Sequence, residues 1–231
     1  MDLYKYDWEP HTVTTEDGYI LTTFNIKGKE APTKSPIIFN HGLFGDAMSW
    51  VGAFLETQPG EQPYILQLVD QGYDVWMTNN RGTAYSQGHK SFAVATSNSY
   101  WDFSFAEMGL YDDKANIKLV KEKSGKKPIW LGWSQGTTQL LYALAKEKAD
   151  GGTFFGENLD KAVLFTPCAV PADGGVVFDP TIGLFKYQEL GVYAINGPNW
   201  ASDAEYLCQN LDEAGCTEVQ TYSYFPGGAS V

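Results

Sequence analysis

Short apolar runs alternate with longer amphipathic stretches from Val13 to Thr166. Apolar positions at helical spacing predict helices over 64–71, 115–123 and 137–148. Glu16-Asp17-Gly18 joins the first two strand-like runs, so we expect a hairpin there. The later alternation of strand and helix predicts an α/β fold, with a mostly parallel, doubly wound sheet and right-handed crossovers. The strand-like runs are 13–15, 19–26, 37–40, 73–77, 128–133 and 161–166.

The composition is that of a folded domain. The chain has 231 residues, of which 43% are hydrophobic and 15% aromatic, enough for one well-cored domain with or without a small insertion. The net charge of −12 comes without any cluster of basic residues, so we expect no nucleic-acid partner. No apolar run is long enough to suggest a transmembrane segment.

One five-residue motif carries the strongest chemical signal. Gly132-Trp133-Ser134-Gln135-Gly136 fits the pattern G-x-S-x-G and lies between an apolar strand and a helix-forming run. In such a nucleophile elbow the serine occupies a strained turn, and side chains at the flanking glycines would collide with the adjoining strand and helix. Ser134 Oγ would then stand at a helix N-terminus, which favours negative charge. The alternative is an ordinary loop serine between two glycines.

A serine nucleophile also needs N–H donors for the tetrahedral intermediate. They typically come from the residue after the nucleophile and from the loop after an earlier strand. Gln135 has the first position, and His41-Gly42-Leu43 follows the strand 37–40. We therefore expect an oxyanion hole formed by the N–H groups of Leu43 and Gln135.

Further motifs are spread along the chain, in the stretches 14–21, 41–46, 72–76, 80–82, 101–108 and 132–137. In their order they resemble the acid lipase family of α/β-hydrolases, which includes gastric and lysosomal triacylglycerol lipases and sterol esterases. The resemblance implies an α/β-hydrolase core over 1–172 and the beginning of a cap or lid over 173–231. It also implies a structural role for the loop of Arg81, the only arginine in the chain.

The resemblance further implies a lipid ester hydrolase, of triacylglycerol lipase or sterol esterase type, that works at a lipid–water interface. The reaction would use Ser134 and an acyl-enzyme intermediate, and no cofactor or metal is expected. A lysosomal or secreted location would follow, although residues 1–7 are too polar for a signal peptide.

The rest of a catalytic triad is not evident. In this fold the order is Ser, then Asp or Glu, then His, yet His11, His41 and His89 all precede Ser134. Asp203 and Asp212 follow it, but in the cap-like region. Three interpretations stay open: an incomplete lipase, a shortened non-catalytic relative that binds lipid or a partner protein, and a chain completed by a separate C-terminal segment.

Two structural expectations remain. Cys168 follows a strand-like run, which suggests a buried thiol, whereas Cys208 and Cys216 are close enough in sequence to form a disulfide. With no further strands after it, the apolar run 162–165 would be an open sheet edge prone to association.

Overall fold

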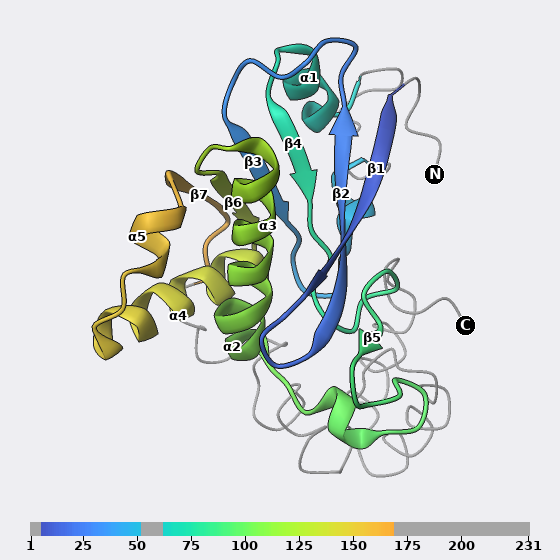
Figure 1. The fold of residues 1–231 in the computed structure, drawn as a ribbon, viewed down its shortest axis with the longest axis vertical. Coiled ribbons are helices and arrows are strands. Elements are labelled where there is room, and N and C mark those ends of the chain that lie inside the picture. Colours follow the sequence, from blue (N-terminus) through green and yellow to red (C-terminus); the bar gives the residue numbers. More distant parts are fainter. Residues whose placement is uncertain (1–5, 52–61, 169–231) are drawn as a thin grey trace, which may run out of the picture.

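A computed structural model describes residues 6–51 and 62–168. Within these residues a mixed sheet has the strand order β1-β2-β4-β3-β6-β7, and β5 (Gly88–His89) pairs with β2 (Figure 1). The expected α/β-hydrolase architecture with a mostly parallel sheet is confirmed. The cap interpretation of 173–231 and the pair Cys208 and Cys216 lie outside the described residues.

The first two strands form the expected hairpin. Strand β1 (Asp7–Thr14) pairs antiparallel with β2 (Tyr19–Lys27) along its whole length. Gly18 in the turn has φ +102°, a conformation that glycine adopts at little cost. Strand β1 begins earlier than the apolar pattern indicates, because its sequence is largely polar and one of its sides faces solvent.

Four parallel strands carry the centre of the molecule. They are β3 (Pro36–Asn40), β4 (Asp74–Met77), β6 (Ile129–Trp133) and β7 (Lys161–Phe165). Strand β3 lies between β4 and β6 and is buried throughout. This central position explains its continuous apolar sequence, since helices cover both of its faces.

Helices cover the two faces of the sheet, as a doubly wound fold requires. Ile37 and Phe39 of β3 belong to the core that includes α1 (Tyr64–Asp70) and the 3-10 helix η1 (Ala47–Trp50). Ile38, pointing the other way, packs with α3 (Lys114–Ser124), α4 (Gln135–Asp150) and α5 (Phe154–Asn158). Successive side chains of β3 therefore pack into two separate cores, one on each face of the sheet.

The segment between β4 and α3 holds structure that the apolar pattern does not predict. It contains the 3-10 helix η3 (Asn98–Trp101), the short helix α2 (Phe105–Glu107) and a π-helical turn, η4 (Met108–Asp113). Tyr100 anchors it by packing with Tyr19 and Leu21 of β2. The π-helical turn runs directly into α3, so the helix begins well before the predicted Ala115.

Strand β7 is the edge of the sheet among the described residues, and the expectation for Cys168 is wrong. Val163 and Phe165 on β7 are exposed, and so is Cys168, whose thiol lies near the carbonyl of Thr166. Leu164 packs against the core of α3, α4 and α5, whereas Val163, Phe165 and Cys168 remain exposed.

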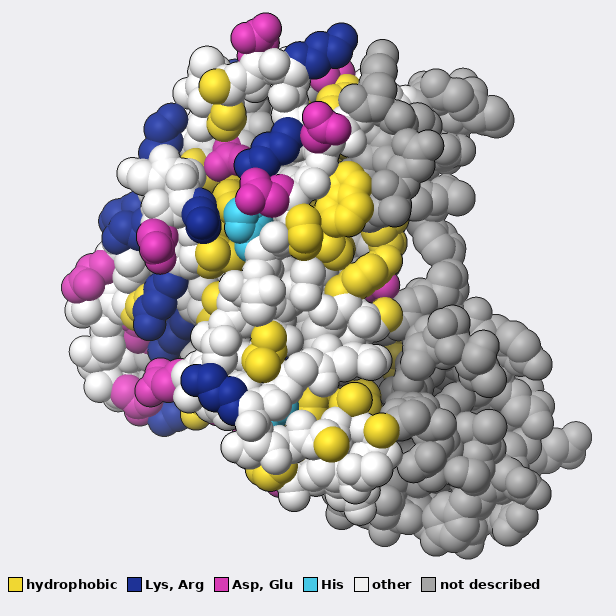
Figure 2. Space-filling model, turned by 45° about the vertical axis from the view of Figure 1, so that its right-hand side comes forward, with side chains coloured by type: hydrophobic (Ala, Val, Ile, Leu, Met, Phe, Trp, Pro, Cys, Tyr) yellow, Lys and Arg dark blue, Asp and Glu magenta, His cyan; other side chains and the backbone are white. Residues whose placement is uncertain are grey.

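Charge is mixed over the described surface. On the face in Figure 2, lysine and acidic side chains are interspersed on one side, whereas apolar side chains gather toward the other. The net charge of −12 therefore does not appear there as a patch of one sign.

Candidate active site

Ser134 occupies a strained turn between β6 and α4. Its φ of +50° and ψ of −117° lie in a region that residues with a side chain rarely adopt. The Ser134 N–H donates to the Phe165 carbonyl on β7, and the Ser134 carbonyl accepts from the N–H and hydroxyl of Thr137. These bonds hold the serine in place at the N-terminus of a sixteen-residue helix.

The two glycines of the motif are required by close contacts. A Cβ at Gly132 would lie 2.6 Å from the carbonyl oxygen of Gly136, in the first turn of α4. A Cβ at Gly136 would lie 2.7 Å from the carbonyl oxygen of Asn40 and 2.9 Å from that of His41. Both neighbours are backbone, so neither can move aside easily. The collisions expected from the sequence are therefore present.

The loop after β3 lies against the serine. A Cβ at Gly42 would be 3.2 Å from the Ser134 Cβ and 3.3 Å from the ring of Trp133. Gly45 donates to the Gly42 carbonyl, and Phe44 between them has φ +60°, so the loop forms a tight turn. Asp46 then caps η1 by accepting from the Met48 N–H. Leu43 thus lies one residue from the contact with Ser134.

Two N–H groups beside the serine are unengaged. Within the described part of the chain, the backbone N–H groups of Leu43 and Gln135 donate to no other residue. For Gln135 this follows from its place as the first residue of α4, whose first-turn donors have no partner in the helix. Its side chain reaches the Met108 sulfur instead.

His41 is engaged in holding the loop. Its Nε2 accepts from the Asn80 N–H at 3.2 Å, so Nδ1 carries the proton and donates to the Gly42 carbonyl at 2.8 Å. Burial lowers the pKa of His41, which agrees with a neutral ring. Both ring nitrogens are used, and neither bonds to Ser134. This geometry is that of a side chain that supports the loop.

A cluster of buried amides lies behind the elbow, which sequence reasoning missed. Asn80 donates to Gln139 at 3.2 Å and accepts from Asn40 at 3.2 Å, while Gln139 donates to Asp113 at 2.5 Å. Burial raises the pKa of Asp113 well above its ordinary value. Asn40 is the last residue of β3, and Asn80 lies in the loop after β4; polar amides at the carboxyl ends of two apolar strands are the signal in the sequence.

Arg81 belongs to a separate, charged cluster. Its guanidinium contacts Asp112 at 2.7 Å and Asp17 at 2.6 Å, and it stacks over the Tyr19 ring at 3.9 Å. Burial raises the pKa of Asp112 to about 6, against the attraction of Arg81. These contacts fasten the hairpin turn to the π-helical turn, a structural role.

No general base lies at the serine among the described residues. His11 is on β1, His41 is engaged as above, and His89 stacks on Phe92. The hydroxyl of Ser134 has no hydrogen-bond partner among these residues. The same residues contain no group of His, Cys, Asp and Glu side chains able to hold a metal ion.

The family follows from the whole chain rather than from one motif. A model of the alpha/beta hydrolase fold family matches residues 35–204. The chain belongs to this family. A second model, of a partial alpha/beta-hydrolase lipase region, matches residues 1–53 of this α/β-hydrolase. Together they cover both the hairpin and the elbow.

Curated relatives of this α/β-hydrolase are lipases. It is 43% identical over 147 residues to lipase member K of Mus musculus, covering 61% of this chain and 35% of that protein. It is 38% identical over 136 residues to the lysosomal acid lipase/cholesteryl ester hydrolase of Homo sapiens, covering 56% and 33%. These matches confirm the resemblance to acid lipases over the N-terminal part. The matched segment spans about a third of each relative.

A solved structure agrees on the fold. An alpha/beta hydrolase from Penicillium sp. sh18 superposes with a TM-score of 0.50 at 15% identity, covering 80% of this chain and 52% of that one. At this identity the likeness concerns the fold alone. As for membranes, no helix in the described ranges combines the length and the apolar character that crossing would need.

Proposed function

We propose that this α/β-hydrolase is part of a lipid ester hydrolase and that Ser134 is its nucleophile. The single observation that carries the proposal is the strained Ser134 at the start of α4, with the N–H groups of Leu43 and Gln135 nearby, which donate to no other described residue. A strained backbone is retained where the surroundings enforce it, and such sites cluster where chemistry occurs.

The reaction follows from this arrangement. Ser134 Oγ attacks the ester carbonyl carbon while a base takes its proton, and the carbonyl oxygen becomes an oxyanion that accepts from Leu43 and Gln135. The carbon–oxygen bond to the alcohol then breaks, and the alcohol leaves with that proton. Water attacks the remaining acyl-serine in the same way, releases the acid and restores the hydroxyl.

The base is proposed to come from outside these 231 residues. The three histidines of the chain lie elsewhere or are engaged, and the matched segment is about a third of each lipase relative. The missing Asp and His would belong to a longer form of this protein or to a complementing C-terminal segment.

An apolar rim supports a lipid substrate. The side chain of Leu43, whose N–H is a proposed oxyanion donor, is 37% exposed, and that of Trp133, the residue before Ser134, is 42% exposed. Large apolar side chains exposed beside a nucleophile favour acyl chains or a lipid–water interface over a polar substrate. Triacylglycerols and sterol esters are both compatible with such a rim.

A second candidate is a non-catalytic relative that binds lipid or a partner protein. The observation favouring it is the lack of any base hydrogen-bonded to Ser134 in the described residues. Under this alternative the apolar rim and the exposed edge of β7 would be contact surfaces only.

Covalent labelling tests the nucleophile. We expect an alkyl phosphonate ester to form one adduct on Ser134, slowly, because oxyanion donors alone retain roughly 10³-fold catalysis over water. Mass spectrometry of the digested protein locates the adduct. Ser134→Ala should abolish it, whereas Ser91→Ala, at an exposed loop serine, should not. An adduct mainly on another serine would refute the assignment.

Turnover separates the two candidates. The chain alone should hydrolyse a short-chain nitrophenyl ester only at a trace of a complete lipase's rate. A segment supplying Asp and His should raise that rate if the chain is a catalytic part. If labelling succeeds but no such segment restores turnover, the non-catalytic candidate is favoured. Full turnover that His41→Ala removes would mean that His41 is the base.

A further inference from the structure

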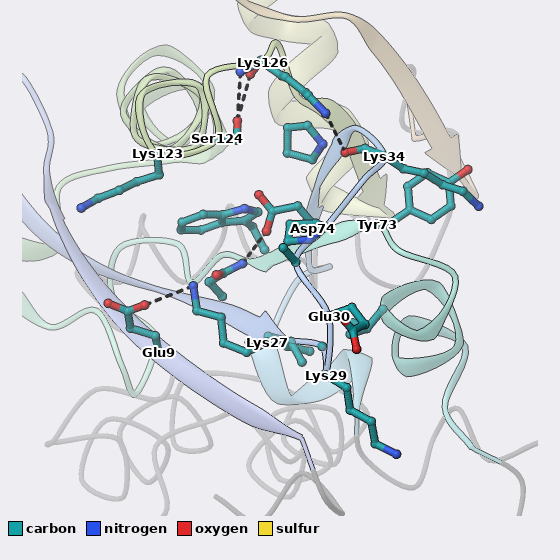
Figure 3. Close-up of a pocket in the computed structure, with 18 of the residues that line it drawn as sticks. Glu9, Lys27, Lys29, Glu30, Lys34, Tyr73, Asp74, Lys123, Ser124 and Lys126 are labelled. Atoms are coloured by element: carbon teal, nitrogen blue, oxygen red, sulfur yellow. Dashed lines mark hydrogen bonds and ion pairs between the residues drawn. The ribbon is translucent and has the colours of Figure 1, made fainter.

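A cavity of about 470 Å³ lies at the end of the sheet opposite the serine (Figure 3). Pro36 and Asp74, which line it, are the first residues of β3 and β4, whereas Ser134 follows the last residue of β6. Strand β3 has five residues, which corresponds to about 13 Å between the two ends. The cavity is therefore separate from the proposed active site.

The cavity is positive in an otherwise acidic protein. Five lysines and three acidic residues line it, while the whole chain carries −12. Two of the three acids have partners: Glu9 pairs with Lys27 at 3.2 Å, and Asp74 accepts from Asn25 at 2.9 Å. Lys123 forms no ion pair with any described residue. Figure 3 shows Lys27 extending from β2 toward Glu9, with Lys123 coming from α3. The lysines are Lys27, Lys29, Lys34, Lys123 and Lys126.

Two residues that line the cavity each hold a buried ring nitrogen with no hydrogen-bond partner among the described residues. These nitrogens are Trp76 Nε1, in a residue only 2% exposed, and His11 Nε2, on a side chain 10% exposed. The two rings contact each other with centroids 4.9 Å apart. Glu9 lies 3.6 Å from His11 Nε2, beyond hydrogen-bond distance, and burial lowers the pKa of His11, so the ring is neutral at neutral pH. An indole N–H can only donate, and leaving it unsatisfied costs stability.

These groups call for one kind of ligand. Ammonium groups require negative charge, and the indole N–H requires an acceptor oxygen; an oxyanion provides both. The volume is in the lower part of the range for small-molecule sites. A lipid headgroup fits less well, because a flat lipid surface at the Ser134 end would leave this end facing water.

We propose that this cavity binds a small water-borne oxyanion, a phosphate or carboxylate group, through Lys27, Lys123 and the indole N–H of Trp76. The proposal does not depend on the proposed esterase chemistry, since none of these residues contacts the elbow.

The test is a titration of the 231-residue chain, labelled with ¹⁵N, with inorganic phosphate and separately with acetate, at ionic strength held constant with sodium chloride. The indole signal of Trp76, identified by its loss in Trp76→Phe, should shift in a saturable way. Lys123→Gln should raise the Kd roughly tenfold or more, because hydrogen bonds to charged groups are the strong ones. Lys148→Gln on α4, the same charge change at an exposed site outside the cavity, should leave it unchanged.

A shift with phosphate only, or with acetate only, supports the site and identifies the preferred group. No saturable shift with either anion, or an equal loss of affinity in Lys148→Gln, overturns the proposal. So does a Trp76 signal that responds only to vesicles of anionic lipid. Lys123 is exposed in the last turn of α3, so Lys123→Gln should fold. Its effect on the Kd therefore tests the proposal even if Trp76→Phe does not fold.

Discussion

Asp112 and Asp113 are neighbours in the chain, both fully buried in the π-helical turn, yet they sit in opposite electrical surroundings. Asp112 meets the guanidinium of Arg81 at 2.7 Å, in a cluster that ties the hairpin to the rest of the fold. Asp113 meets only amides, Gln139 at 2.5 Å and Asn40 at 3.4 Å, in the cluster behind the elbow.

The difference shows how one residue type serves two purposes. Burial raises the pKa of Asp112 to about 6, so with Arg81 beside it the carboxyl is ionised at neutral pH. Burial also raises the pKa of Asp113 well above its ordinary value, and its printed partners among the described residues are amides and not cations. Any shift toward the protonated form lessens the negative charge behind the elbow. The Arg81 cluster joins two parts of the fold, whereas the amide cluster lies behind Ser134.

The largest expected effect on stability comes from removing the positive charge of Arg81. Arg81→Met leaves Asp112 buried without its partner, and we expect a loss of about 3–5 kcal/mol in the free energy of unfolding. Urea denaturation at pH 7 measures it. Lys161→Met is the control, because this lysine is 71% exposed and only 3.6 Å from Asp160, and it should cost well under 1 kcal/mol. A similar small loss in both variants would show that the Arg81 cluster does not hold the fold.

An intermediate effect is expected at the elbow. Gly136→Ala places a Cβ 2.7 Å from the backbone of Asn40, so we expect a loss of about 1–3 kcal/mol and at least tenfold slower phosphonate labelling of Ser134. Gly156→Ala is the matched control, since nothing lies within 4 Å of its Cβ position. Thermal unfolding and labelling rates are measured together. Normal labelling in Gly136→Ala would mean that the backbone contact is not needed for the serine's geometry.

The smallest expected effect concerns the buried carboxyl of Asp113 and depends on pH. A carboxyl with a raised pKa binds its proton in the folded state while the unfolded chain, with a pKa of about 3.9, has lost it. Stability from this group is therefore full below about pH 4 and declines as the pH rises toward the folded-state pKa. Asp113→Asn should remove that decline.

The expected readout is a difference between two curves of unfolding free energy against pH. Wild type and Asp113→Asn should run parallel below about pH 4, and the variant should gain relative stability above it. Asp112, His11 and His41 also contribute to each curve, but equally, so they cancel in the difference. A constant offset from pH 4 to 8 would show that Asp113 is ionised in the folded protein.

The sequence predicts the fold well where local rules agree with tertiary contacts. The apolar strand 37–40, the glycines at 132 and 136 and the hairpin around Gly18 all have the neighbours that their sequence context indicates. The elbow geometry was likewise foreseeable, because a serine between two glycines at a strand–helix junction leaves the backbone little choice.

Other features depend on contacts between distant residues. Nothing near Asp113 in the sequence announces Gln139 or Asn40 as partners, and the burial of the pair follows from how α4 packs on the π-helical turn. The expectation for Cys168 is wrong because the apolar run before it forms β7, which is an edge strand among the described residues; its exposure is a property of the sheet and not of the run.

The π-helical turn has a consequence for changes in chain length. Such a turn corresponds to an α-helix with one residue inserted, and the helix on either side keeps its facing. Deleting a single residue between Met108 and Asp113 would leave Ile117 and Val120 on α3 packed against the sheet. It would, however, remove the turn in which Asp112 contacts Arg81 and Asp113 contacts Gln139. The length of this turn therefore decides which partners the two neighbouring acids meet.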